Sequence, residues 1–140
     1  MQLGVDFQNI LDFYYKEIRS VLEYGSVVFN GSLTKKLSNE IESVQRLVLK
    51  LLSNHLNLQF SYEEACTFYC TEPLSLRRIE QSENFIRRNL HSGLFSKSQN
   101  AYNTRAASQI HFKEFKCNTN RFYNSPLVYL TRLANKLNLN

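Results

Sequence analysis

The stretch Ile18–Leu47, IRSVLEYGSVVFNGSLTKKLSNEIESVQRL, predicts the end of one helix, a short apolar link and most of a second helix. Gly25 follows an apolar-periodic run, a position typical of the left-handed residue that ends a helix. The link Ser26–Gly31 holds two valines and Phe29 between turn-forming residues. We therefore expect a helix pair joined by an aromatic plug, with Phe29 packed against both helices.

The first helix is expected from about Asp6 to Tyr24, because apolar residues recur there at three- and four-residue steps. Its predicted buried stripe consists of Phe7, Ile10, Leu11, Tyr14, Ile18, Val21 and Leu22.

The second helix is expected from about Leu33 to Ser53, again on apolar periodicity. Its predicted buried stripe is Leu37, Ile41, Val44, Val48 and Leu51, widened by Leu47 and Leu52. The opposite face is expected to carry Lys35, Lys36, Glu40, Glu42, Arg46 and Lys50. Glu42 and Arg46 stand four residues apart, in the orientation that favours a surface ion pair on a helix.

Two further helices are expected in residues 54–93. Ser61 and Glu64 match a capping box, which opens a short helix through Tyr69 that ends before Pro73. The next helix is expected from about Ser75 to His91, with Gly93 as its stop. Its predicted inward side chains are Leu76, Ile79, Phe85, Ile86 and Leu90, and its predicted outer side carries Arg77, Arg78, Arg87 and Arg88.

The last part of the chain is different. Residues 94–124 lose the helical period, apart from a weak alternation at Ile110–Phe112, and predict an irregular basic segment. Ser125 as N-cap and Pro126 at the first helical position then predict a terminal helix. Its expected apolar face is Leu127, Leu130, Leu133, Ala134 and Leu137.

These elements predict a mainly α protein. We expect a small helical bundle organised as a helix pair (1–53), two further helices (54–93) and an irregular basic segment with a terminal helix (94–140). Together they make one compact domain or less.

Composition narrows the class of protein. An apolar fraction of 43% excludes intrinsic disorder, and no apolar run is long enough to span a membrane. An odd number of cysteines and no secretory signal predict an intracellular location, with nucleus and cytoplasm both open. Cys66 and Cys70 are expected to be small buried apolar residues rather than metal ligands.

Charge is unevenly distributed along the 140 residues. Residues 1–70 hold six basic and eight acidic side chains, a net −2, and residues 71–140 hold eleven and four, a net +7. Such asymmetry favours a negatively charged partner, foremost nucleic acid, although a solvated basic surface is an alternative explanation.

Sequence patterns that would indicate a catalytic site are weak in this chain. The only aspartates, Asp6 and Asp12, lie near the start of the first helix, where they favour its dipole. The histidines stand in three different segments, no glycine-rich phosphate loop is present, and Glu64 of the pair Glu63–Glu64 already has a capping role. We expect no enzyme activity and no cofactor in this chain alone.

Three sets of residues, in this order, resemble the C-terminal thumb and post-thumb region of reverse transcriptases from non-LTR (LINE-like, jockey-type) retrotransposons. The first set is Leu22–Gly25, Val28–Phe29 and Val44–Arg46. The second is Pro73–Leu74 with Arg77–Arg78, and the third is Thr119, Arg121–Phe122 and Asn124–Ser125. The chain departs from the family in lacking Trp, since Phe29 and Ala134–Asn135 stand where the family often has it.

The resemblance implies a fragment of an RNA-directed DNA polymerase. In that family, paired aspartates and Mg²⁺ perform the transfer in a palm that this chain lacks, and the thumb grips the template–primer duplex. It therefore implies a non-catalytic chain that contacts the backbone of an RNA–DNA or DNA duplex without sequence preference. The candidate contact residues are Lys35, Lys36, Gln45, Arg46, Lys50, Arg105, Lys113, Lys116 and Arg121.

Two alternatives remain open at the level of sequence. The chain is a helical protein-interaction module that docks on a missing polymerase palm or a host partner, or it is a decayed remnant without function.

Overall fold

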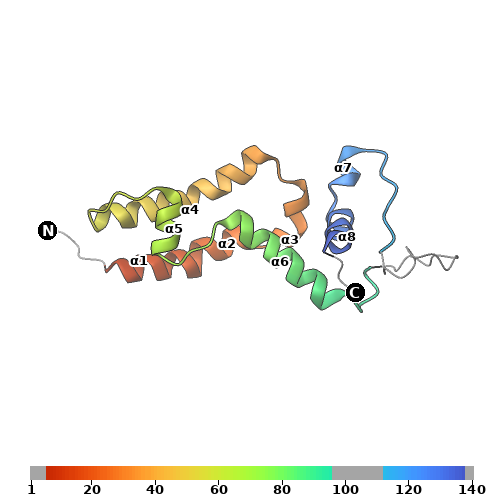
Figure 1. The fold of residues 1–140 in the computed structure, drawn as a ribbon, viewed down its shortest axis with the longest axis horizontal. Coiled ribbons are helices and arrows are strands. Elements are labelled where there is room, and N and C mark those ends of the chain that lie inside the picture. Colours follow the sequence, from red (N-terminus) through yellow and green to blue (C-terminus); the bar gives the residue numbers. More distant parts are fainter. Residues whose placement is uncertain (1–5, 96–111, 138–140) are drawn as a thin grey trace. The chain divides into compact units, whose positions relative to one another are not determined.

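A computed structural model describes residues 6–95 and 112–137, which are mainly helical, as expected (Figure 1). The chain divides into two compact units. Unit 1 comprises Met1–Gly25 and Leu33–Arg78, and unit 2 comprises Ser26–Ser32 and Ile79–Asn140. Each unit combines segments that are distant in sequence, so the units do not follow the linear division at residues 53 and 93.

The first helix of unit 1 contains a π turn. It consists of α1 (Phe7–Phe13), the π-helical segment η1 (Tyr14–Ile18) and α2 (Arg19–Glu23). A π turn uses more residues than an α turn, so the residues after it are rotated about the helix axis. The expected burial of Val21 is consequently wrong, because its side chain is 73% exposed. Gly25 adopts the expected left-handed conformation, with φ +67°.

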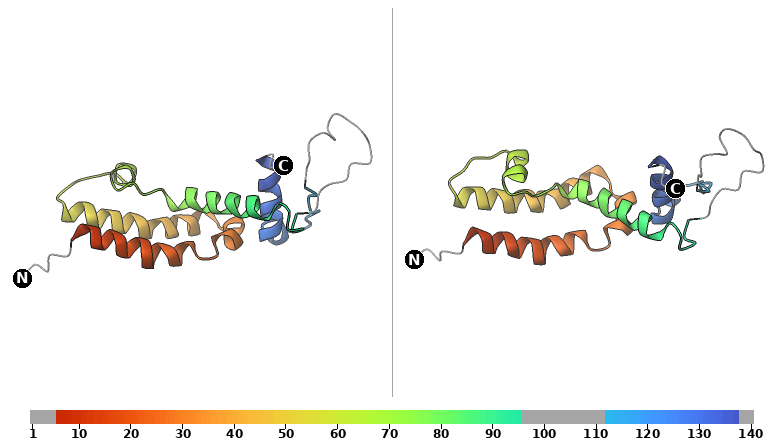
Figure 2. Two further views of the ribbon diagram at one scale, coloured as in Figure 1. Left: turned by 90° about the horizontal axis from the view of Figure 1, so that it is seen from below. Right: turned by 60° about the horizontal axis from the view of Figure 1, so that its bottom comes forward.

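Helix α4 (Lys35–His55) runs beside α1 in the opposite direction (Figure 2). Thr34 caps it, because its hydroxyl accepts a hydrogen bond from the Leu37 amide at 3.3 Å. The buried face differs in part from the expected one, of which Leu52 is buried. Leu37, Leu47 and Leu51 are 47%, 58% and 58% exposed, and the buried positions are Glu42, Gln45, Leu49, Leu52 and Ser53. This face is buried because it carries the polar groups that bind neighbouring elements, as described below.

Helix α5 (Tyr62–Phe68) begins at the expected capping box. The Ser61 hydroxyl accepts from the Glu64 amide, and the Glu64 carboxylate accepts from the Ser61 amide at 2.8 Å. Cys66 is buried in α5, but the expectation that Cys70 is also buried is wrong. Cys70 follows the end of the helix in a left-handed conformation, with φ 50°, and is exposed.

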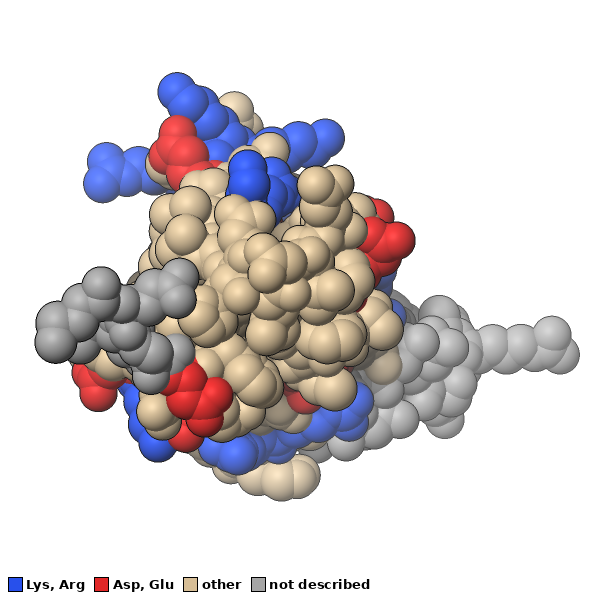
Figure 3. All heavy atoms as spheres, turned by 90° about the vertical axis from the view of Figure 1, so that its left-hand side faces the viewer, with Lys and Arg blue, Asp and Glu red and all other residues tan. Residues whose placement is uncertain are grey.

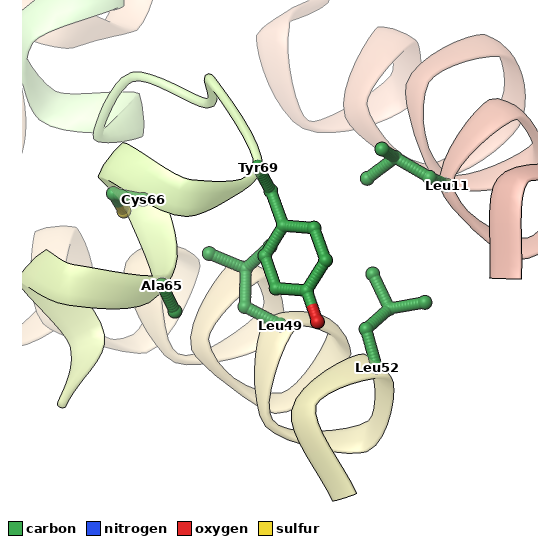
Figure 4. Packing of buried hydrophobic residues seen from close by; sticks show 6 residues of the cluster. All are labelled: Leu11, Leu49, Leu52, Ala65, Cys66 and Tyr69. Atoms are coloured by element: carbon green, nitrogen blue, oxygen red, sulfur yellow. The ribbon is translucent and has the colours of Figure 1, made fainter. Parts of the chain in front are cut away.

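The apolar core of unit 1 joins α1, α4 and α5. Its side chains interdigitate as Figure 4 shows, with the Tyr69 ring directed from the end of α5 toward α4. The buried members are Leu11, Leu49, Leu52, Ala65, Cys66 and Tyr69.

Helix α6 (Leu74–Asn89) begins in unit 1 and continues in unit 2. Its buried side chains recur every four residues and are Leu74, Arg78, Ser82 and Ile86. Leu76 and Ile79, expected inward, are 59% and 41% exposed, and Arg78, expected outside, is buried. The Arg78 guanidinium donates to the Ser38 hydroxyl at 2.7 Å, and burial lowers the pKa of this side chain.

Unit 2 begins in the link between the paired helices. The link is helical rather than a plug between turns, with α3 (Ser26–Phe29) followed by the 3-10 segment η2 (Asn30–Ser32). Val27 packs against the core of this unit, Val28 is exposed and Phe29 is half-buried. The buried members of the core are Ile86, Phe95, Phe112, Leu130 and Ala134.

The C-terminal part of unit 2 contains α7 (Asn120–Tyr123) and α8 (Pro126–Lys136). Helix α8 begins as expected, with Ser125 at the N-cap position and Pro126 next. Helix α7 lies in the segment that was expected to be irregular. It forms because the Thr119 hydroxyl accepts a hydrogen bond from the Phe122 amide at 3.2 Å, which caps the first turn. Ile110 and His111 lie outside the described residues.

None of the helices in residues 6–95 and 112–137 combines the length and the apolar character needed to cross a bilayer.

Candidate nucleic-acid interface

One side of α4 carries four exposed cations, Lys35, Lys36, Arg46 and Lys50, here named the α4 basic face. At 3.6 residues per turn, Lys35, Arg46 and Lys50 project within a sector of about 60° and extend over about 22 Å. Among the residues that the structure describes, none of the four forms an ion pair with a carboxylate. Their positive charge is therefore available to a ligand.

Arg46 occupies a defined position on this face. Its guanidinium lies over the ring of Tyr62, 4.9 Å from the centroid, a cation–π arrangement that limits the motion of a long side chain. The expected surface pair of Arg46 with Glu42 is wrong, because the Glu42 carboxylate is turned into the protein and binds α6.

A pocket of about 420 Å³ adjoins the C-terminal half of the α4 basic face. Arg46 and Lys50 line one side of it, and α5 and the preceding loop line the other. The remaining polar lining comes from Ser53, Asn54, Gln59, Ser61 and Tyr62. Figure 3 looks onto the side of unit 1 where α1, α4 and α5 lie, and shows a largely uncharged face with both basic and acidic side chains at its edges. Cations beside amide and hydroxyl donors are the groups that proteins use to bind phosphate oxygens.

The prediction that Gln45 belongs to this contact surface is wrong. Gln45 is fully buried, and its amide connects three elements. Its Oε1 accepts from the Tyr14 hydroxyl at 2.6 Å, and its Nε2 donates to the Tyr62 hydroxyl and to the carbonyl of Glu72, both at 3.0 Å. A buried amide with its donors and acceptor satisfied stabilises the fold rather than binding a ligand.

Glu42 connects α4 to the start of α6. Its carboxylate accepts hydrogen bonds from the backbone amides of Leu74 at 3.0 Å and Ser75 at 3.1 Å, and from the Tyr62 hydroxyl. The first amides of a helix have no partner within the helix, and a negative charge there is favourable. Glu42 thus caps α6 from another helix and holds the two helices together.

The tyrosine hydroxyls of this network are held in the protonated form. Burial raises the pKa of Tyr14 far above its ordinary value, and burial with the Glu42 hydrogen bond does the same for Tyr62. Both hydroxyls therefore stay protonated at neutral pH. Burial also raises the pKa of the Cys66 thiol, which lowers its content of reactive thiolate.

The structure brings together residues from the sequence motifs of the first two sets. Glu23 accepts a bidentate pair of hydrogen bonds from Arg77, at 2.5 and 3.1 Å. Gln45 and Glu42 bind the segment that contains Glu72, Leu74 and Ser75. Several motif residues of unit 1 therefore join its helices, whereas Tyr24 and Arg46 are exposed.

The basic residues of the C-terminal segment form a different surface, in unit 2. Lys113, Lys116 and Arg121 are all exposed, and Arg105 lies outside the described residues. Sequence reasoning missed the aromatic side chains between these cations, of which Phe115, Phe122 and Tyr123 are 43%, 43% and 47% exposed. The signal was present as alternating basic and aromatic residues in KEFKCNTNRFY, residues 113–123.

Within the described ranges, no three His, Cys, Asp or Glu side chains are grouped closely enough to hold a metal ion. No protein-family model matches the chain, and no curated protein or solved structure shows significant similarity to it.

Proposed function

We propose that this chain binds the backbone of a nucleic-acid duplex through the α4 basic face, as a non-catalytic part of a retrotransposon RNA-directed DNA polymerase. The ligand implied by the sequence resemblance is the RNA–DNA hybrid of template and primer. The observation that carries the proposal is the set of four exposed cations on one helix, none paired with a carboxylate in the described part of the chain.

The physical basis is counterion release. A protein that neutralises phosphates with Lys and Arg displaces condensed cations, so affinity falls steeply with salt and does not depend on base sequence. Four such contacts increase the magnitude of the negative logarithmic salt slope by about 3.6, because each contributes about 0.9 for duplex DNA. The network of Glu42 and Gln45 supports this role, because it holds α4 against its neighbours while the basic side stays exposed.

Binding of a labelled 20-base-pair RNA–DNA hybrid, measured by fluorescence anisotropy at several salt concentrations, tests the proposal. In the variant Lys35→Gln, Lys36→Gln, Arg46→Gln and Lys50→Gln, we expect weaker binding and a salt slope that is smaller by about 3 to 4. The matched control is Leu47→Gln with Leu51→Gln, which changes exposed residues of the same helix without changing charge. Equal affinity and equal slope for the parent chain and the cation variant would contradict the proposal.

The second candidate function is a protein-interaction module that docks on a polymerase palm or a host protein. Its specific support is the apolar flank of α4, formed by Leu37, Leu47 and Leu51, which are about half exposed. Large exposed apolar patches mark interaction surfaces. The Leu47→Gln, Leu51→Gln variant discriminates, because a docking role predicts loss of binding to a purified palm domain while hybrid binding persists. A chain that binds neither the hybrid nor the palm supports a decayed remnant.

A further inference from the structure

Exposed aromatic rings and exposed cations alternate in one segment of unit 2. Phe115, Phe122 and Tyr123 are each more than two-fifths exposed, although their large apolar rings favour burial. The cations between and beside them, Lys113, Lys116 and Arg121, are all exposed.

The segment is anchored on both sides of these rings. The Phe112 ring is buried 5.5 Å from the ring of Phe95, and the Asn135 side chain binds both the amide of Phe112 at 2.8 Å and its carbonyl at 3.0 Å. Thr119 caps the turn that carries Phe122. The exposed rings are thus attached to backbone that is already fixed, which lowers the entropy lost on binding a ligand.

Contacts among side chains also orient the rings. The guanidinium of Arg132 stacks on Tyr123 at 3.5 Å from the centroid and donates to the Tyr123 carbonyl at 2.8 Å. Phe115 meets Phe122 edge to face, with 6.3 Å between centroids. An edge-to-face pair leaves one ring face open to another planar group.

The charge of the region selects the class of ligand. Residues 112–137 contain five cations (Lys113, Lys116, Arg121, Arg132 and Lys136) and one carboxylate, Glu114, so the net charge is 5 − 1 = +4. That carboxylate accepts a hydrogen bond from Asn135 at 3.1 Å. Two hollows adjoin the rings. One, of about 180 Å³, is lined partly by Phe115, Tyr123 and Arg132, and an open one is lined partly by Arg121 and Phe122.

We propose that this surface binds unpaired nucleotides, with bases stacked on Phe115 and Phe122 and phosphates bound by Lys113, Lys116 and Arg121. Aromatic platforms interleaved with cations bind single strands without strong sequence preference, because every base has a π face. Paired bases are stacked on one another and cannot offer that face. The inference rests on the proposed nucleic-acid role for its ligand class, and it assigns the single-stranded part of that ligand to unit 2.

Tryptophan fluorescence tests the stacking directly, because the chain contains no Trp. In the full chain with Phe122→Trp, we expect the emission to be quenched when a 12-nucleotide single-stranded RNA is added. Phe13→Trp is the matched control, since Phe13 is 59% exposed in unit 1, and its emission should not change. Quenching of both variants alike, or of neither, overturns the inference.

An affinity comparison separates this inference from the proposed function. In Phe115→Leu with Phe122→Leu, which keeps every charge, we expect single-stranded RNA to bind at least about thirtyfold more weakly, because two stacking contacts are lost and each contributes about fivefold or more. Binding of the fully paired hybrid should stay within about twofold.

The outcomes are distinct. If the parent chain binds the hybrid but not the single strand, or if the leucine variant binds the single strand as well as the parent does, only the present inference fails. If the α4 cation variant binds the hybrid normally while the leucine variant loses the single strand, only the proposed function of α4 fails. If the parent chain binds neither nucleic acid, both fail.

Discussion

Gln45 and Glu42 show how single polar residues decide which side of a helix is buried. Each lies in the middle of α4, and each places several hydrogen-bonding atoms among partners from other elements. An unpartnered amide or carboxylate in the same place would be destabilising by a few kcal/mol, so burial depends on all these partners being present. The partners lie 17 to 33 residues away in sequence. Residue type alone therefore assigns both side chains to the surface.

Substitution of Glu42 tests this role at the scale of the residue. We expect Glu42→Ala to lower the free energy of unfolding by about 2–3 kcal/mol, because the Leu74 and Ser75 amides lose their acceptor. Glu40→Ala, on the exposed side of the same helix, is the control and should change stability by less than about 0.5 kcal/mol. Urea unfolding followed by circular dichroism measures both. Equal effects of the two substitutions would show that Glu42 does not hold α6.

Helix α4 has three distinct sides at the scale of the element. One side is buried against α1 and α5, the second is the apolar flank of Leu37, Leu47 and Leu51, and the third is the α4 basic face. Part of the periodic apolar stripe that predicts the helix forms the flank, whereas the buried side is centred more than a third of a turn away from that flank. Burial follows the elements that pack against the helix, and these also satisfy its polar groups.

The link between the paired helices offers a second test at this scale. A Cβ added to Gly31 would lie 2.5 Å from Cγ and 2.6 Å from Cβ of Tyr129 in α8, and atoms at the base of a side chain cannot move aside without moving the helix. We therefore expect Gly31→Ala to destabilise unit 2 by about 1–3 kcal/mol, as overpacking does.

Hydrogen exchange of the α8 amides, measured by mass spectrometry, is the readout for Gly31→Ala, and faster exchange is the expected result. Ser32→Ala, at the neighbouring exposed position, is the control and should exchange as the parent chain does. Unchanged α8 protection in Gly31→Ala would mean that the link does not pack on α8 as described.

At the scale of the whole molecule, the free energy of unfolding should fall as the pH rises above about 10. Burial raises the pKa of Tyr14 and Tyr62 above the ordinary value of 10.0, so above about pH 10 the folded chain keeps protons that the unfolded chain has lost. The resulting stabilisation is fully present below pH 10 and is lost as pH rises toward the folded-state values.

Urea midpoints measured between about pH 8 and pH 11 check this dependence. In the parent chain, the contribution of these two tyrosines to stability should be constant between about pH 8 and pH 10. The urea midpoint should fall above pH 10. The double variant Tyr14→Phe, Tyr62→Phe should be less stable at neutral pH, with a shallower alkaline decline. A decline of equal steepness in parent and variant would assign the effect to other groups.

Local features were predictable from the sequence. The capping box at Ser61–Glu64, the left-handed Gly25 and the start of α8 at Ser125–Pro126 are all as expected, because a cap or a turn depends on residues within four positions of it. The α4 cations Lys35, Lys36, Arg46 and Lys50 were placed correctly for the same reason, since helical spacing puts them on one side.

What the sequence by itself determined is therefore the helical character of the protein, the ends of several helices and the separation of basic from apolar positions along α4. Only the tertiary structure decided which side of α4 is buried, that Gln45 belongs to the core, and that the link joins the C-terminal part of the chain in unit 2. The physical reason is the separation along the sequence between the residues that interact. Periodicity and capping are set by neighbours along the chain, whereas burial of a polar group is set by partners that only folding brings within hydrogen-bonding distance.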